Sequence, residues 1–239
     1  MASPDSFRLH LSYGGTFDPV HNGHLAVARD AGNALGVPVW LTPAADPPHR
    51  APPGASAGQR AAMLERALDG QGRLRMDLRE LRRADADPER RSWTIDTLHE
   101  LRGELGPHAP IALLLGADSF VGLPSWRDWR ELFALAHFVV ADRPGSPLDG
   151  GLPAELAQIL AERLSDSATA LETAPAGRIW RLQQPLRPES ATDIRRRIVA
   201  GQPWRGLVPA AVADYILAHG LYGAGGATPG HGPSTGTAL

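Results

Sequence analysis

The sequence predicts an α/β domain in which an open, mainly parallel sheet carries helices on both faces and is followed by a small C-terminal helical segment. Short apolar runs alternate with helical patterns along most of the chain, which is typical of parallel strands joined by right-handed crossovers. The run Ile111 to Leu115 is apolar throughout, as expected of a strand buried on both faces. With 239 residues, 43% of them hydrophobic, the chain can form one large core.

The first half of this Rossmann-like pattern begins with a strand, a glycine turn and a helix. Phe7–Tyr13 is a short β-rich run that ends at Gly14-Gly15, and Leu25–Leu35 has helical spacing and stops at Gly36. Pro and Gly then punctuate the chain too densely for regular structure over Pro43–Gly58. The other expected elements are strands at Val37–Leu41 and Leu74–Leu78, and helices at Gln59–Leu68 and at Thr94–Leu105, the latter capped by Ser92 or Thr94.

The second half continues the alternation and then loosens. The expected strands are Ile111–Leu115, Phe138–Ala141 and Arg178–Leu182, and the expected helices are Ala154–Leu164, Thr192–Ala200 and Pro209–His219. We expect one domain over residues 1–222, with a helical subregion at about 185–222. The tail, residues 223–239, is rich in Gly, Pro, Ser and Thr and is expected to be disordered.

Composition excludes several kinds of chemistry. All 24 basic residues are arginine, so no lysine can form a Schiff base, a lysyl-adenylate or a P-loop contact. The absence of cysteine excludes disulfides, thiol nucleophiles, thiolate zinc sites and iron–sulfur clusters. The net charge of −2 gives no electrostatic footprint for nucleic acid or anionic membranes, and no segment has the pattern of a signal peptide or membrane span. We therefore expect a soluble cytoplasmic protein without nucleic-acid or membrane partners.

One string matches a hydrolase motif. Gly54-Ala55-Ser56-Ala57-Gly58 has the form G-x-S-x-G, which works only on a strained turn between a strand and a helix. Two prolines precede it here, so we expect a loop and no serine nucleophile. The glycines of the tail likewise follow no strand, and no dinucleotide-binding fingerprint is present.

The turn from Gly14 to His24, GGTFDPVHNGH, carries the strongest functional signal. It follows the first expected strand, and ligands of open α/β sheets bind outside the carboxyl ends of strands. Its glycines allow close approach of the backbone, and the helix N-terminus after it suits phosphate. His21 and His24 lie on one side of the helix start, where imidazoles can donate hydrogen bonds to phosphate oxygens.

Two other interpretations of the histidine pair stay open, namely zinc ligation and packing or helix capping. Zinc is disfavoured because the sequence lacks the glutamate of H-E-x-x-H and an identifiable third ligand. We therefore expect no resident metal site.

A second candidate anion site is Ser190-Ala191-Thr192-Asp193-Ile194-Arg195. Ser190 and Asp193 fit a helix capping box, which leaves Thr192 and Arg195 to be explained. A hydroxyl and a forked guanidinium at a helix start can bind phosphate. Two such sites in one domain indicate a substrate with several phosphates that is held from both ends.

Together these motifs resemble the nucleotidyltransferase superfamily with the H-x-G-H signature, and within it the bacterial nicotinate-nucleotide adenylyltransferases. H-x-G-H alone identifies the superfamily, whereas an ordered set of further motifs indicates the nicotinate member. The similarity runs from about Phe7 to Tyr222, so residues 1–222 are expected to form a nucleotidyltransferase domain. The further motifs are Pro47-Pro48-His49-Arg50, Ser92 to Leu98, Gly116 to Ser119, Leu123 to Trp126, Arg143-Pro144-Gly145 and Leu207 to Ile216.

The resemblance implies roles for particular residues. His21 and His24 would be catalytic, Trp126 would stack on the pyridine ring, and backbone N–H groups near Ile95 and Arg127 would receive the nicotinate carboxylate. The implied ATP-binding residues are Gly14, Gly15, Thr16, Phe17, His21, His24, Gly116, Asp118, Ser190, Thr192 and Arg195. The implied acceptor-binding residues are Asp18, His49, Arg50, Thr94, Ile95, Trp126, Arg127 and Arg143.

Some of these residues also have structural interpretations, and two neighbours depart from the family pattern. Asp118 could cap a helix, His49 could be a solvated loop residue, and Trp126 could belong to the core. Trp93 stands where the family usually has tyrosine, and Glu189 stands where an apolar residue usually precedes the serine.

The implied reaction is in-line attack by the phosphate of nicotinate mononucleotide on the α-phosphorus of ATP, with Mg²⁺ arriving on ATP. A phosphate monoester, with a second pKa of about 6, is already a nucleophile at neutral pH, so alignment and charge stabilisation suffice. Two alternatives stay open. One is the same chemistry on nicotinamide mononucleotide, phosphopantetheine or another phosphate-bearing acceptor, and the other is a non-catalytic nucleotide-sensing module.

Overall fold

The computed structural model describes residues 8–45, 54–87, 89, 91–142, 148, 151–185 and 187–225. Its centre is one six-stranded sheet in the order β3-β2-β1-β4-β5-β6, and every neighbouring pair is parallel. The predicted α/β class with a parallel sheet is confirmed. The strands are β1 (His10–Gly15), β2 (Val39–Pro43), β3 (Leu74–Met76), β4 (Ile111–Gly116), β5 (His137–Ala141) and β6 (Ile179–Leu182).

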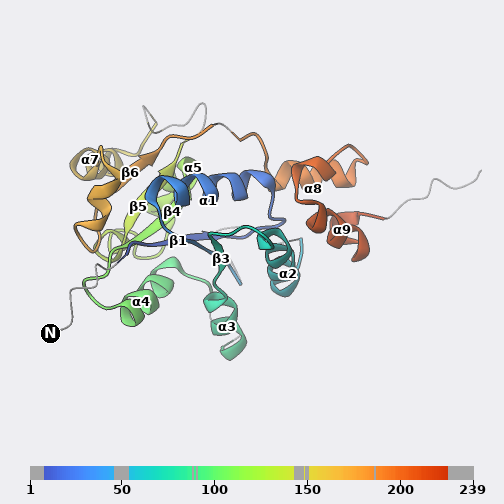
Figure 1. Cartoon of the computed structure of the whole chain (residues 1–239), viewed down its shortest axis with the longest axis horizontal. Coiled ribbons are helices and arrows are strands. Elements are labelled where there is room, and N and C mark those ends of the chain that lie inside the picture. Colours follow the sequence, from blue (N-terminus) through green and yellow to red (C-terminus); the bar gives the residue numbers. More distant parts are fainter. Residues whose placement is uncertain are drawn as a thin grey trace, which may run out of the picture.

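Helices cover both faces of the sheet, and Figure 1 shows α1 above it and α3 and α4 below it. The α-helices are α1 (Asn22–Leu35), α2 (Ala57–Leu68), α3 (Arg79–Ala86), α4 (Thr94–Leu105), α5 (Ala117–Val121), α6 (Leu132–Leu135), α7 (Ala154–Arg163), α8 (Ala191–Val199) and α9 (Ala210–Ala218). The short helices η1 (Leu123–Ser125), η3 (Ala168–Glu172), η4 (Arg205–Leu207) and η5 (Leu221–Gly223) are 3₁₀ turns.

The two faces of the sheet carry two hydrophobic clusters, which β4 separates by the period-two alternation of a strand. Ala112 and Leu114 pack in the first cluster with α1, whereas Ile111, Leu113 and Leu115 pack in the second with α4. β4 is therefore buried on both faces, as its apolar run predicts.

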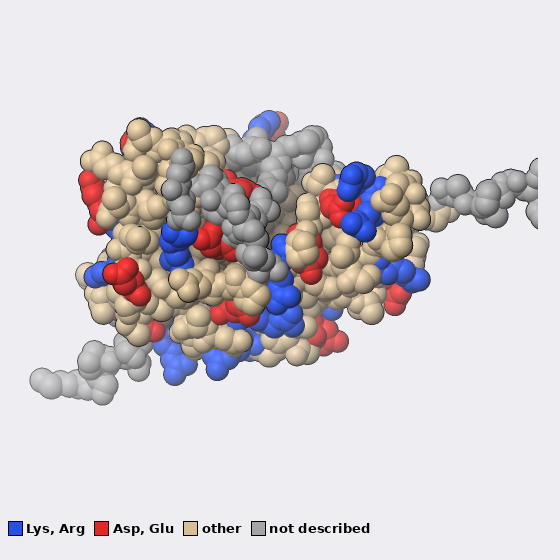
Figure 2. All heavy atoms as spheres, turned by 90° about the horizontal axis from the view of Figure 1, so that it is seen from above, with Lys and Arg blue, Asp and Glu red and all other residues tan. Residues whose placement is uncertain are grey.

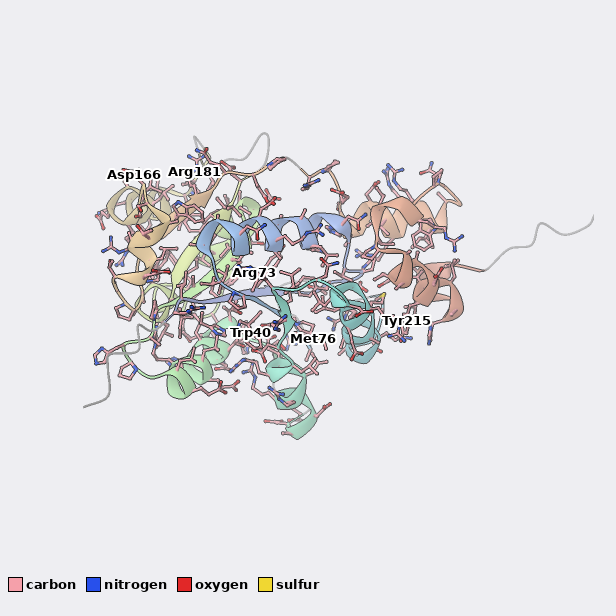
Figure 3. All side chains as sticks on the ribbon, in the orientation of Figure 1. Trp40, Arg73, Met76, Asp166, Arg181 and Tyr215 are labelled. Atoms are coloured by element: carbon pink, nitrogen blue, oxygen red, sulfur yellow. The ribbon has the colours of Figure 1, made fainter. Side chains whose placement is uncertain are left out.

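The C-terminal helices belong to the first cluster and do not form a separate core. Ile194 of α8 and Ile216 of α9 are fully buried in it. Tyr215 of α9, labelled in Figure 3, lies under Arg66 of α2, whose guanidinium carbon is 4.5 Å from the ring centre. Ala224 is also buried in this cluster. The expected disordered tail falls mainly on residues 226–239, which lie outside the described residues.

Three local features of the structure can be compared directly with what the sequence predicts. Ser56 caps α2 by accepting a hydrogen bond from the Gln59 N–H at 3.2 Å, which agrees with a structural role and not with a hydrolase nucleophile. The predicted caps of α4 are wrong, because its N-cap is Trp93 and the Ser92 hydroxyl instead accepts from the Ala45 N–H at 3.1 Å. α3 was not predicted, because its sequence RELRRADA has hardly any apolar residues.

The surface is mixed in charge. On the face drawn in Figure 2, basic and acidic side chains are interspersed among neutral ones. Among the described helices we find none with the length and apolar character that crossing a bilayer requires.

Candidate active site

The candidate site lies where the strand order changes direction. β1 is followed in sequence by its neighbour β2, whereas its other neighbour, β4, starts the second half of the sheet. Ligands of such sheets bind in the crevice at this switch point, outside the carboxyl ends of the strands. The turn after β1 leads to His21 and His24, and Gly116 at the end of β4 caps α5, which carries Asp118 in its first turn. Two of the three implied ATP-binding segments therefore follow β1 and β4, the strands on either side of the switch point.

His21 and His24 cap helix α1 reciprocally. The His24 N–H donates to Nδ1 of His21 and the His21 N–H donates to Nδ1 of His24, each at 3.3 Å. The two rings stack with their centres 3.6 Å apart. Capping was one of the interpretations left open by the sequence, and it is correct without excluding contact with phosphate.

This capping fixes the chemistry of the two rings. An imidazole whose Nδ1 accepts a hydrogen bond carries its proton on Nε2, so both histidines are donors at Nε2. Burial lowers the pKa of His21 from its ordinary value of 6.5 to about 4. His21 is therefore a neutral hydrogen-bond donor at pH 7.

Asp18 connects the histidine turn to the C-terminal helices. Its carboxylate accepts from the backbone N–H groups of Gly54 at 2.8 Å and Ala55 at 3.1 Å, and from the Tyr222 hydroxyl at 2.7 Å. Arg195 donates to the Asp18 carbonyl oxygen at 2.6 Å, and its guanidinium lies 3.6 Å from the carboxylate. Arg195 therefore contacts Asp18, a residue that is close in sequence to the histidine pair. A ligand held from both ends requires such proximity.

The same contacts bear on the predicted role of Asp18. Its side chain is 5% exposed and accepts hydrogen bonds from three protein groups, so the carboxylate holds the site together and is poorly placed to contact an acceptor. Burial and the Asp18 carboxylate raise the pKa of the Tyr222 hydroxyl well above its usual range. Tyr222 is consequently a permanent donor to Asp18.

The other residues of the first turn contribute mainly through their backbone. Phe17 is 2% exposed and packs edge-on against the rings of Tyr13 and His24. A side chain at Gly15 would meet the Phe17 ring at 3.0 Å, so glycine is required there by packing. Gly14 has open space where a side chain would stand, and Thr16 is half-buried.

Two of the segments predicted to bind the acceptor, the start of α4 and the segment around Trp126, contact each other. Ser92 contacts Ala45 just beyond the end of β2, which places the start of α4 at the carboxyl edge of the sheet. Ile95 is buried, and Thr94 is half-buried beside it. Trp126 is half-buried against the second cluster. The guanidinium carbon of Arg127 lies 5.7 Å from the Trp93 ring centre. Trp93, which stands where the family usually has tyrosine, therefore provides a stacking surface for Arg127.

The phosphate motif on α8 differs in part from its prediction. Ser190 is the N-cap, but its side chain makes no capping hydrogen bond, so the predicted capping box is wrong. Asp193 instead binds Arg196 and Arg197 one turn later, because two arginines compete for its carboxylate. Thr192 accepts a hydrogen bond from Arg195 at 3.4 Å.

Glu189 brings a carboxylate close to the start of α1. A side chain on Gly23 would meet Oε2 of Glu189 at 3.3 Å and the His21 ring at 3.1 Å. This oxygen is buried and has no hydrogen-bond partner among the described residues. One carboxylate oxygen of Glu189 therefore lies beside the start of α1 without a hydrogen bond from the described residues.

Three predicted residues cannot be placed, and two residues that contact the first turn were not predicted. His49, Arg50 and Arg143 lie outside the described residues. The sequence alone did not identify Tyr222, which marks only the end of the similarity. It also missed Arg60, which contacts the first turn. The only signal for Arg60 in the sequence is an arginine at a helix position that faces the core, where arginine is rare.

Comparisons with known proteins agree with this geometry. A family model described as cytidylyltransferase-like matches residues 12–197. A probable nicotinate-nucleotide adenylyltransferase from Stenotrophomonas maltophilia is 58% identical over 90% of this chain and 96% of its own, and one from Xylella fastidiosa (strain 9a5c) is 48% identical over the same shares. The chain belongs to the nicotinate-nucleotide adenylyltransferase family. It is therefore a nucleotidyltransferase.

Solved structures confirm the fold of this enzyme. A Plasmodium falciparum nicotinic acid mononucleotide adenylyltransferase complexed with NaAD superposes with a TM-score of 0.68 over 91% of this chain and 98% of its own, at 14% identity. A putative nicotinate-nucleotide adenylyltransferase from Vibrio parahaemolyticus gives 0.56 over 90% and 96%, at 16% identity.

The two functions of His21 can be separated by substitution. In His21→Asn, the amide oxygen can replace Nδ1 as the cap of α1, since asparagine is a good N-cap, but no group replaces Nε2–H. We expect an unchanged melting temperature and a kcat about 10²–10³-fold lower, the scale for losing one preorganised donor. The matched variant His21→Ala should lose the cap as well. A folded His21→Asn enzyme with near-normal kcat would show that Nε2 plays no part.

The low pKa of His21 predicts how stability changes with pH. The folded state keeps His21 neutral down to about pH 4, whereas the unfolded chain protonates it near pH 6.5, so the protein is destabilised as pH falls through this window. Between pH 7.5 and 5 the wild type should lose about 2 kcal/mol more unfolding free energy than His21→Asn, which does not titrate. Urea unfolding at both values of pH measures this, and equal losses would contradict the burial of a neutral His21.

Proposed function

We propose that the enzyme transfers the adenylyl group of ATP to nicotinate mononucleotide, giving nicotinate adenine dinucleotide and pyrophosphate for NAD biosynthesis. The observation that carries this proposal is the histidine capping box at the start of α1, which leaves an Nε2–H donor on each ring, together with Arg195, which binds Asp18 in the turn before it. The relatives that match almost the whole chain are named for this acceptor.

The transfer needs no covalent intermediate with the protein. An oxygen of the acceptor phosphate attacks the α-phosphorus, and the bond to the bridging oxygen of the β-phosphate breaks, so pyrophosphate leaves. The Nε2–H groups of His21 and His24 donate to phosphate oxygens, and Arg195 supplies positive charge near Thr192. Neutral donors that are already in place stabilise the developing charge without reorganising, so a site lacking lysine and cysteine is sufficient.

The magnesium requirement is assigned to the substrate. Within the described part of the chain, no group of three His, Asp or Glu side chains could hold a metal ion, and the Asp18 carboxylate is already engaged. We propose that Mg²⁺ would enter with ATP, because this ion retains water and often relies on substrate oxygens. When bound, the ion offsets phosphate charge. A cytoplasmic location stays a prediction from the sequence.

The acceptor site is assigned to the start of α4 and the segment after η1. The nicotinate carboxylate would be received by backbone N–H groups near Ile95 and Arg127. Helix α4 has no side-chain cap at its N-cap residue, which supports this use of its first N–H groups. The half-buried Trp126 would cover the pyridine ring.

A three-acceptor assay tests the function. Purified protein with Mg²⁺ and ATP is offered nicotinate mononucleotide, nicotinamide mononucleotide or phosphopantetheine, and pyrophosphate release is measured. We expect release mainly with nicotinate mononucleotide. Preference for another acceptor would reassign the substrate, and release with none would favour a nucleotide-sensing module.

Trp126→Ala tests the stacking role. Loss of an aromatic platform should weaken nicotinate mononucleotide binding by about 1–3 kcal/mol, while ATP binding stays unchanged. Isothermal titration with each nucleotide measures both affinities. Trp126→Phe keeps a ring and should retain most of the affinity, and an unchanged acceptor Kd in Trp126→Ala would assign Trp126 to the core alone.

A further inference from the structure

Arg60 of α2 is a fully buried arginine, 1% exposed, that binds backbone carbonyl oxygens. Its guanidinium donates to Thr16 at 2.7 Å, Ala44 at 2.6 Å, Ala45 at 2.8 Å and Ala55 at 3.3 Å. Burying a guanidinium is costly unless its donors are satisfied, and this geometry satisfies them with main chain. The position therefore favours arginine for its forked donors and not merely for its charge.

The four carbonyls belong to three segments at the carboxyl edge of the sheet. Thr16 lies in the turn after β1, Ala44 and Ala45 follow β2, and Ala55 precedes α2. The Ala55 N–H in turn donates to the Asp18 carboxylate, whose residue binds Arg195. Arg60 therefore connects the first turn to the groups that hold Arg195.

The contact with Thr16 also fixes the direction of a backbone donor. The C=O and N–H of a trans peptide point to opposite sides, so a Thr16 carbonyl that faces Arg60 turns the Phe17 N–H away from it. Phe17 has a φ of 50°, a left-handed conformation that costs a bulky residue energy and persists only where its surroundings impose it. Arg60 is one of the contacts that impose it.

We propose that Arg60 is a positioning residue for adenylyl transfer, holding the Thr16–Phe17 peptide so that the Phe17 N–H is presented to the phosphates of ATP. This inference rests on the proposed function. It assigns an effect on the chemical step to Arg60, although this residue of α2 is buried.

Arg102 provides a matched control. Its guanidinium also binds several carbonyls, among them Ala109 and Leu135, each at 2.5 Å. These residues precede β4 and β5, so Arg102 acts at the opposite edge of the sheet. Arg102→Met removes a comparable set of hydrogen bonds without touching the site.

The experiment compares Arg60→Met and Arg102→Met for melting temperature, kcat, acceptor KM and folded fraction by circular dichroism. Both variants should melt earlier than wild type. Among folded molecules, Arg60→Met should lower kcat about 10²-fold, the scale for a small misplacement of catalytic groups, with acceptor KM changed less than about threefold. Arg102→Met should keep kcat within about threefold of wild type. A kcat within that range for folded Arg60→Met, or an equal loss in Arg102→Met, would overturn the inference.

A second variant covers the case in which Arg60→Met does not fold. Arg60→Lys keeps the charge, but one ammonium cannot span four carbonyls, so kcat should still fall at least about tenfold. Wild-type kcat in Arg60→Lys would overturn the role. Adenylyl transfer by the wild type is measured first. Its absence would overturn the proposed function, whereas an active wild type with an equally active Arg60 variant overturns only this inference.

Discussion

The buried carboxylate of Asp18 is the constraint on which the site depends. An isolated carboxylate would be expensive at 5% exposure, and Asp18 is stabilised because two backbone N–H groups, the Tyr222 hydroxyl and Arg195 surround it. These donors come from the segment before α2 and from the C-terminal helices. Satisfying one charge therefore brings three distant parts of the chain together beside the histidine turn.

The imidazole rings of His21 and His24 have both a structural role and a proposed chemical role. The Nδ1 atoms of His21 and His24 satisfy N–H groups that the start of a helix would otherwise leave to water, and this leaves protons on the Nε2 atoms. The rings are consequently oriented before any ligand arrives. Burial keeps His21 neutral at pH 7, so under the proposed function His21 would contribute a directed hydrogen bond.

The sequence predicts what is local and leaves open what is not. Alternating apolar runs located all six strands, and the sequence placed the turn at Gly14 to His24 between the first strand and the first helix, because both signals lie within a few residues. α3 was not predicted from the sequence, because hydrogen bonds and ion pairs with Asp77 anchor it in place of an apolar face. The role of Asp18 depends on Tyr222, 204 positions away, and no spacing rule reaches that far. Ser190 and Asp193 fit a capping pattern that nearby arginines override.

Glu189 and Asp18 are both carboxylates near the histidine pair, yet they differ in their hydrogen-bond partners. Asp18 is surrounded by donors and adds no repulsion that they do not offset. Oε2 of Glu189 is buried beside Gly23 and the His21 ring without a described partner. Charges about 4 Å apart interact by about 1 kcal/mol in water and more near a protein surface, so Glu189 opposes a bare polyphosphate. A triphosphate whose charge is offset by its own cation would meet less of this opposition.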